Sequence, residues 1–213
     1  MKCDKKMMRL YAVTDRAWTG EQTLYEQVEA ALKGGVTCVQ LREKRLDHDS
    51  FLQEAIELAA LCRRYGVPFF INDDVDIAIQ CHADGIHVGQ EDMAAAQVRQ
   101  RVGDGMMIGV SVHSVEQAQE AVRSGADCLG VGAVFSTSTK TDVEVLPHET
   151  LRAICEAVEV PVVAIGGIHK ENLLELAGSG VDGVALVSAI FAAEDIEREC
   201  RTLCSLSEQM TGN

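Results

Sequence analysis

The stretch that decides the fold is Pro68-Phe69-Phe70-Ile71-Asn72-Asp73-Asp74. Three large apolar residues in a row, without alternation, predict a short strand buried on both faces, as in a parallel sheet. The run then stops on an amide and two carboxylates, which indicates a strand end at a rim and not in a core. Adjacent carboxylates at a rim repel one another unless a cation or a proton lies between them. This strand end is therefore a candidate metal-binding site.

The rest of the chain repeats the same plan of an apolar run followed by a helical pattern. Further strands are expected at 10–14, 37–42, 85–88, 107–111, 128–132, 161–165 and 183–187. Helices are expected at 21–33, 50–65, 75–81, 93–102, 114–125, from 147 onward, at 170–177 and at 192–206, with a capping box S-x-x-Q opening the one at Ser114.

Eight alternating units in 213 residues predict one domain, a single (β/α)8 TIM barrel over residues 1–213. The alternative is an open doubly wound sheet. The dinucleotide fingerprint G-x-G-x-x-G is absent after the first strand, which weakens that alternative.

Composition narrows the classes of partner. Lys and Arg total 19 against 33 Asp and Glu, a net charge of −14. So acidic a chain argues against nucleic acid as a partner, and any phosphate site must be built from local cations and amides. The chain has eight cysteines without a CxxC pair, no signal peptide and no 18-residue apolar run. These features predict reduced core thiols in a cytoplasmic protein that does not span a membrane. A homo-oligomer is compatible with the sequence.

In a (β/α)8 barrel the active site lies at the carboxyl ends of the strands. Gln40, Arg42 and Lys44 alternate at the end of the second strand and can share one face, which suits an anion. Glu43 faces the other way or lies in the loop. The alternative for all four is a solvated, charged loop.

Carboxylates at two neighbouring strand ends form the candidate metal site. Asp92 follows the fourth strand, next to the third strand that ends at Asp73. Together they could hold one hard cation such as Mg²⁺, which prefers carboxylate and phosphate oxygens. Asp74 is expected to cap the following helix and Glu91 to face solvent.

Other strand ends carry hydroxyls and glycines. Ser111 and His113 could form a nucleophile pair, but no G-x-S-x-G elbow surrounds them, which favours a ligand-binding hydroxyl. His87 is expected to be a hydrogen-bonded core histidine. The polar run Thr137-Ser138-Thr139-Lys140 suits phosphate, or is a polar lid. Gly166-Gly167 and Val187-Ser188 fall in the two loops where many such barrels bind phosphate.

Taken together, these clusters resemble the thiamine phosphate synthase family over nearly the whole chain. The resemblance rests on six short motifs in the right order, namely Gln40-Leu41-Arg42-Glu43-Lys44, Asn72-Asp73-Asp74, His87-Val88-Gly89-Gln90-Glu91-Asp92, Gly109-Val110-Ser111, Thr137-Ser138-Thr139-Lys140 and Gly166-Gly167-Ile168. Ser136 departs from the family pattern, since many relatives carry proline there.

The resemblance implies a transferase that joins hydroxymethylpyrimidine pyrophosphate to a thiazole phosphate, or its carboxylated form, and releases pyrophosphate to give thiamine phosphate. It implies that the pyrimidine pyrophosphate is bound by Gln40, Leu41, Arg42, Glu43, Lys44, Asn72 and Ser111. It implies that the thiazole phosphate is bound by Thr137, Ser138, Thr139, Gly167, Val187 and Ser188. Asp73 and Asp92 would hold Mg²⁺, and Arg42, Lys44 and Lys140 would neutralise the leaving group.

Three other functions remain open on the sequence alone. Related thiazole tautomerases lack the paired aspartates and carry a histidine where this chain has Ala133, so both features favour the synthase. A phosphosugar isomerase or epimerase would need a carboxylate or histidine base at a strand end. A barrel that only binds phosphate ligands is opposed by the intact lysines and aspartates.

Overall fold

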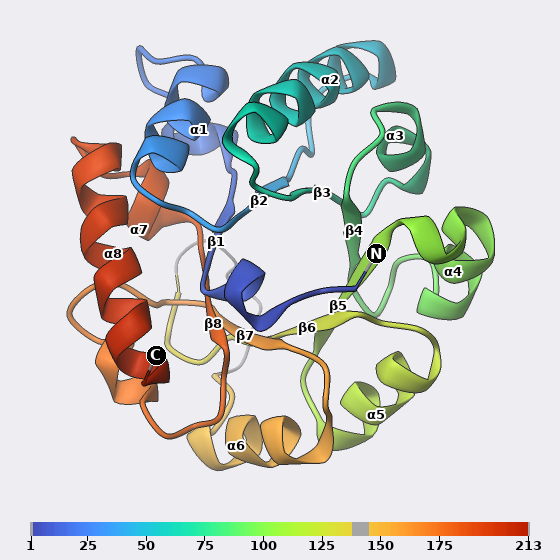
Figure 1. Cartoon of the computed structure of the whole chain (residues 1–213), viewed down its shortest axis with the longest axis vertical. Helices are drawn as coiled ribbons and strands as arrows, with labels where there is room; N and C mark the ends of the chain where they lie inside the picture. Colours follow the sequence, from blue (N-terminus) through green and yellow to red (C-terminus); the bar gives the residue numbers. More distant parts are fainter. Residues whose placement is uncertain (1, 138–144, 213) are drawn as a thin grey trace.

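The computed structural model describes residues 2–137 and 145–212. In these ranges, eight parallel strands pair in sequence order and the last returns to the first, with Leu10 opposite Val184, so the sheet is a closed barrel. The strands are β1 (Leu10–Val13), β2 (Cys38–Leu41), β3 (Phe69–Asn72), β4 (Gly85–Val88), β5 (Met107–Val112), β6 (Cys128–Gly132), β7 (Val162–Ile165) and β8 (Gly183–Leu186). The predicted barrel is confirmed (Figure 1).

Helices surround the barrel, one after each of β1 to β6 and two after β8, while a 3-10 turn follows β7 (Figure 1). They are α1 (Leu24–Lys33), α2 (His48–Tyr65), α3 (Val75–Gln80), α4 (Ala95–Val102), α5 (Val115–Arg123), α6 (His148–Ala157), α7 (Ser188–Phe191) and α8 (Ile196–Thr211). The helix expected at 170–177 is wrong, because only the 3-10 turn η4 (Leu173–Leu176) forms there. The helix expected at 192–206 begins later and ends later, and α7 precedes it.

Side-chain caps set where several helices begin. Thr23 and Glu26 form a complete capping box at α1, and Asp74 accepts from the Ile77 N–H at α3, as the sequence predicted. The box predicted at α5 is only half formed. Ser114 accepts from the Gln117 N–H, but the Gln117 side chain accepts from the N–H of His113 instead of Ser114.

The barrel interior is filled by one small cluster. Tyr11 and Phe70 meet edge to face with their ring centroids 5.7 Å apart. Gly85 makes room for Phe70, since a Cβ on Gly85 would lie 2.3 Å from that ring. Met8, from the 3-10 turn η1 (Lys5–Met8), is buried in the same cluster, and Figure 1 shows η1 across the amino-terminal end of the barrel. The buried Met8 side chain therefore covers that end of the barrel interior, and the polar ends of the strands lie at the opposite rim.

All eight cysteines lie in the described residues and are free thiols, five of them buried, as predicted. The thiolate is the form that binds metals and reacts. Burial raises the pKa of the Cys200 thiol to about 12, which disfavours the thiolate. Among the described residues, no helix is both long and apolar enough to cross a membrane.

A repeated clasp ties the strands together at the amino-terminal end. The residues directly before β2, β4, β6 and β8 each accept, through the side chain, an N–H at the start of the preceding strand, from its first residue or, in β5, from its second. The same four residues donate their own N–H to a carbonyl of that strand. They are Thr37, Asp84, Asp127 and Asp182. Each clasp satisfies two backbone groups where the ladder would otherwise begin unpaired.

The clasps predict a stability effect far from the rim. Replacing Asp84 by alanine leaves the Phe69 N–H without its acceptor, which is 2.9 Å away in the structure. We expect the free energy of unfolding to fall by about 1–3 kcal/mol, measured by urea denaturation. Asp84→Asn keeps an acceptor oxygen and should lose less.

Glu159→Ala, at an exposed position between α6 and β7, serves as the control. An Asp84→Ala protein as stable as this control would show that the clasp does not stabilise the barrel.

Candidate active site

The floor of the open rim is polar. Gln40 and Asn72 each lie two positions beyond a residue of the interior cluster, so both point toward the barrel axis. Gln40 is buried and its Nε2 donates to the Tyr11 hydroxyl at 2.9 Å. A layer of hydrogen-bonding groups thus covers the apolar interior, where a ligand at the rim would rest.

Ser111 pairs with His87 and not with His113. The Ser111 Oγ lies 3.0 Å from Nε2 of His87, on the neighbouring strand. The lack of a side chain at Gly109 makes room for this ring, because a Cβ there would lie 2.4 Å from the His87 Nδ1. His113 instead places its Nδ1 2.7 Å from the Gly132 carbonyl oxygen. His87 is thus a hydrogen-bonded core histidine, as predicted, and the Ser111–His113 pair does not form.

The turn after β3 aims two adjacent carboxylates in different directions. Asp73 adopts a left-handed backbone, with φ of +65°, which is uncommon for residues other than glycine and is tolerated best by Asp and Asn. Its N–H donates to the His87 carbonyl at 2.9 Å, which fixes the turn against β4. Asp74 turns away to cap α3. Backbone of this rare kind is often kept at functional sites.

Asp92 meets Asp73 at the rim. One Asp92 oxygen accepts from the Gly89 N–H at 2.7 Å, which holds the carboxyl over the end of β4. Burial raises the pKa of the Asp92 carboxyl, the adjacent Asp73 carboxyl raises it further, and the Gly89 N–H and Lys44 lower it. This is the signature of two carboxyls forced together.

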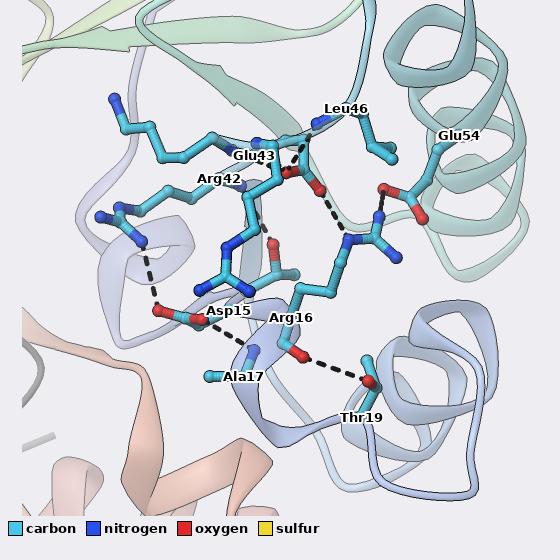
Figure 2. A network of polar contacts seen from close by, with 11 residues as sticks. Asp15, Arg16, Ala17, Thr19, Arg42, Glu43, Leu46 and Glu54 are labelled. Atoms are coloured by element: carbon cyan, nitrogen blue, oxygen red, sulfur yellow. Dashed lines mark hydrogen bonds and ion pairs between the residues drawn. The ribbon is translucent and has the colours of Figure 1, made fainter.

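One cation stands beside this carboxyl pair, and a second lies on the β1 side of the same strand end. Lys44 forms an ion pair with Asp73, and about half of the Lys44 side chain is exposed. The Arg42 guanidinium donates to Asp15 at 3.2 Å, across the top of β1 (Figure 2). The structure therefore brings Lys44, Asp73 and Asp92 together at the ends of β2 to β4, while the Arg42 side chain pairs with Asp15 on the β1 side.

Two residues of the second-strand motif do not face the mouth. Leu41 is fully buried in the core between the sheet and the helices, so only its backbone could reach a ligand. The Glu43 carboxylate turns toward Arg16 of the 3-10 turn η2 (Arg16–Trp18) and toward the following loop (Figure 2). The sequence reasoning missed Asp15 and Arg16. The sequence feature that could have revealed them is an acidic residue followed by a basic one shortly after the first strand. These charges are complementary to Arg42 and Glu43 directly after the second strand.

The loops after β7 and β8 have the shape that the glycines predicted. Gly167 has φ of +66°, and a Cβ on it would lie 2.3 Å from the Ser136 carbonyl oxygen. The Asn172 side chain donates to the Gly167 carbonyl at 2.9 Å. Val187 precedes the short helix α7, in which Ser188 is the first residue. These loops and α7 lie at the same rim as the carboxyl pair.

The long loop between β6 and α6 starts and ends at this rim. Its base is pinned where the Leu146 N–H donates to the Ala133 carbonyl at 2.7 Å and the Phe135 N–H to the Gly166 carbonyl at 3.0 Å. Thr137 is the last described residue in the first part of this loop, and Ser138, Thr139 and Lys140 lie outside the described residues. Their predicted contacts with phosphate stay predictions.

The chain is similar to known proteins in both sequence and fold. A family model described as thiamine monophosphate synthase matches residues 10–190. Thiamine-phosphate synthase of Ruminiclostridium cellulolyticum is 48% identical and covers 92% of this chain and 94% of the relative. That of Clostridium acetobutylicum is 45% identical over 92% of each. The solved thiamine phosphate pyrophosphorylase of Pyrococcus furiosus superposes with a TM-score of 0.90 at 39% identity, over 98% of this chain and 99% of that one. The chain belongs to the thiamine monophosphate synthase family.

Proposed function

We propose that this chain is a thiamine phosphate synthase whose active site is the open rim of the barrel. It joins hydroxymethylpyrimidine pyrophosphate to a thiazole phosphate and releases pyrophosphate. Beside family membership, the observation that carries the proposal is the meeting of Asp73 and Asp92 next to Lys44, with Arg42 two residues before Lys44 at the end of β2. Such a cluster suits a pyrophosphate leaving group, because anions need local positive charge in a chain of net charge −14.

The pyrimidine pyrophosphate would lie over β2 to β5. Gln40, Asn72 and Ser111 offer amide and hydroxyl groups to the pyrimidine ring from the floor. Arg42 and Lys44 would bind the pyrophosphate oxygens with charge-assisted hydrogen bonds. Lys44 would have to leave Asp73 in part to do so, and its exposed side chain allows that movement. Leu41 and Glu43 would contribute through the backbone and through loop geometry.

The residues at the carboxyl pair fit Mg²⁺. No third metal-binding side chain joins Asp73 and Asp92 among the described residues, so substrate and water oxygens would complete the coordination. Mg²⁺ is often held in this way, by one or two carboxylates plus substrate phosphates. Burial first, and then the adjacent Asp73 carboxyl, raise the pKa of Asp92, and a cation between the two carboxyls would favour their charged forms. When bound, Mg²⁺ would neutralise charge that develops on the departing pyrophosphate.

In this reaction the protein would position the substrates and neutralise charge, and no side chain would act as a nucleophile. The carbon–oxygen bond to pyrophosphate breaks, and its electron pair leaves with the pyrophosphate. The remaining pyrimidine methyl cation is stabilised by its ring, and the lone pair of the thiazole nitrogen forms the new carbon–nitrogen bond. Arg42, Lys44 and, from the loop, Lys140 would hold the leaving charge. Holding the two rings in line would supply much of the remaining acceleration.

The thiazole phosphate would lie across the barrel mouth, over β6 to β8. Many (β/α)8 barrels bind phosphate with the loops after strands seven and eight and the start of a short extra helix. Gly167, Val187 and Ser188 occupy those loops here, and α7 is such a helix. Thr137, Ser138 and Thr139 would add hydroxyls from the neighbouring loop. This places the two substrates in separate subsites that meet above the axis.

The proposed activity is tested by incubating the protein with both substrates and Mg²⁺. We expect thiamine phosphate and pyrophosphate to appear in equal amounts, measured by chromatography and by a coupled pyrophosphate assay. Heat-denatured protein and reactions lacking one substrate are the controls. Conversion of the thiazole alone, without the pyrimidine, would instead indicate an isomerase.

The metal assignment predicts a difference between neighbouring carboxylates. Asp73→Asn and Asp92→Asn should each raise the Mg²⁺ concentration at half-maximal activity by about tenfold or more, since each removes a charged metal ligand. The measurement is a magnesium titration at saturating substrates.

Asp74→Asn and Glu91→Gln are the matched controls, each adjacent in sequence to one of the proposed ligands. Asp74 caps α3, and asparagine caps a helix about as well, so Asp74→Asn should keep the fold and leave the magnesium titration nearly unchanged. Equal shifts in all four variants would contradict the ligand assignment, and activity in excess chelator would contradict a role for metal.

A further inference from the structure

Arg16 bridges two carboxylates behind the second-strand motif. Its Nε donates to Glu43 at 2.8 Å and its Nη2 to Glu54 of α2 at 2.6 Å (Figure 2). The Glu43 side chain is only 3% exposed, so this pair is largely shielded from solvent. A buried carboxylate is retained only when it is fully compensated. The position of Glu43 therefore depends on Arg16.

Glu43 in turn organises the loop that follows it. Its other oxygen, Oε1, accepts from three consecutive backbone N–H groups, those of Lys44 at 2.7 Å, Arg45 at 2.6 Å and Leu46 at 3.3 Å. Burial alone would raise the pKa of Glu43, but the bonds from Arg16 and from these amides outweigh it and hold the pKa below its ordinary value. The carboxylate thus acts as the centre around which the Lys44–Leu46 backbone is wrapped.

The same two loops are joined a second time, with the charges reversed. Asp15, which precedes Arg16, binds the Arg42 guanidinium at 3.2 Å. Asp15 also accepts from the Ala17 N–H at 2.9 Å, which fixes it at the start of η2. Asp15 and Arg16, which follow β1, therefore pair in the same order with Arg42 and Glu43, which follow β2. This double pairing fixes both the backbone around Glu43 and the Arg42 head group.

We propose that Arg16 is a positioning residue for pyrophosphate binding, which holds Arg42 and Lys44 in place through the Glu43 carboxylate without touching the substrate. The proposal rests on the proposed function and assigns Glu43 a supporting role instead of a direct contact. Arg42 and Lys44 flank Glu43 in the chain, so any movement of that carboxylate would move both cations together.

The test is a comparison of Arg16→Met with the wild-type enzyme. Methionine keeps much of the length and apolar character of the side chain and removes the guanidinium. We expect the KM for the pyrimidine pyrophosphate to rise about tenfold, while the KM for the thiazole phosphate stays within about twofold. The Kd for inorganic pyrophosphate with Mg²⁺, measured by calorimetry, should weaken by a similar factor. Arg152→Met removes an arginine paired with Glu156 on the exposed face of α6 and should change none of these values.

A double-mutant cycle asks whether Arg16 acts through the flanking cations. Arg16→Met should raise the pyrimidine KM less in a Lys44→Met background than in the wild type, because one of the two cations that Arg16 positions is gone. Arg16→Lys can reach only one of the two carboxylates and should fall between the wild type and Arg16→Met. If Arg16→Met does not fold, the substrate comparison is made with Arg16→Lys.

Two outcomes would overturn the proposal. A lower Tm with both KM values unchanged would give Arg16 a purely structural role, and an equal rise in both KM values would show that it does not act on one subsite. Wild-type protein that makes no thiamine phosphate would refute the proposed function instead. In that case the calorimetric loss of pyrophosphate binding still tests Arg16.

Discussion

Closure of the sheet between β1 and β8 is the constraint on which the rest of the structure depends. Because the strands form a complete parallel ring, all eight carboxyl ends come to one rim, and residues far apart in the chain meet there. The opposite end is closed by η1, by the buried side chain of Met8 and by the four clasps before the even-numbered strands. The contacts that close the barrel thus lie at one end, and the polar and charged groups of the candidate site lie at the other.

The rim gathers charges that would be unfavourable without a ligand. Asp73 and Asp92 are held together by backbone contacts from neighbouring strands, and the raised pKa of Asp92 reflects the result. Lys44 relieves part of this repulsion by pairing with Asp73. A site that binds both Mg²⁺ and pyrophosphate needs charges of both signs. Carboxylates attract Mg²⁺ but repel pyrophosphate, and basic side chains do the reverse. Pairing them with each other keeps both available.

Much of this could be predicted from the sequence because it depends on local periodicity and on topology. Apolar runs that end on polar residues predict both the strands and the rim, and the parallel pairing of β3 with β4 makes Asp73 and Asp92 neighbours. The prediction failed where the signal was tertiary. The apolar residues of 170–177 pack as the 3-10 turn η4, and α7 continues the apolar run of β8, so no break in the pattern marks it. The pairing of Asp15 and Arg16 with Arg42 and Glu43 joins residues 27 positions apart, which periodicity does not reveal. The direction of Glu43 was left open for the same reason.

The central claim is that one divalent cation, shared by Asp73 and Asp92, binds the pyrophosphate to this rim. The most direct measurement is a crystal structure with pyrophosphate and Mn²⁺, which takes the same oxygen ligands as Mg²⁺ and can be located by anomalous scattering. The account predicts an anomalous peak at about 2.1–2.2 Å from a carboxylate oxygen of each residue, with a pyrophosphate oxygen also bound. A peak that contacts Asp74 or Glu91 instead, or pyrophosphate bound at the rim with no peak beside it, would contradict the account.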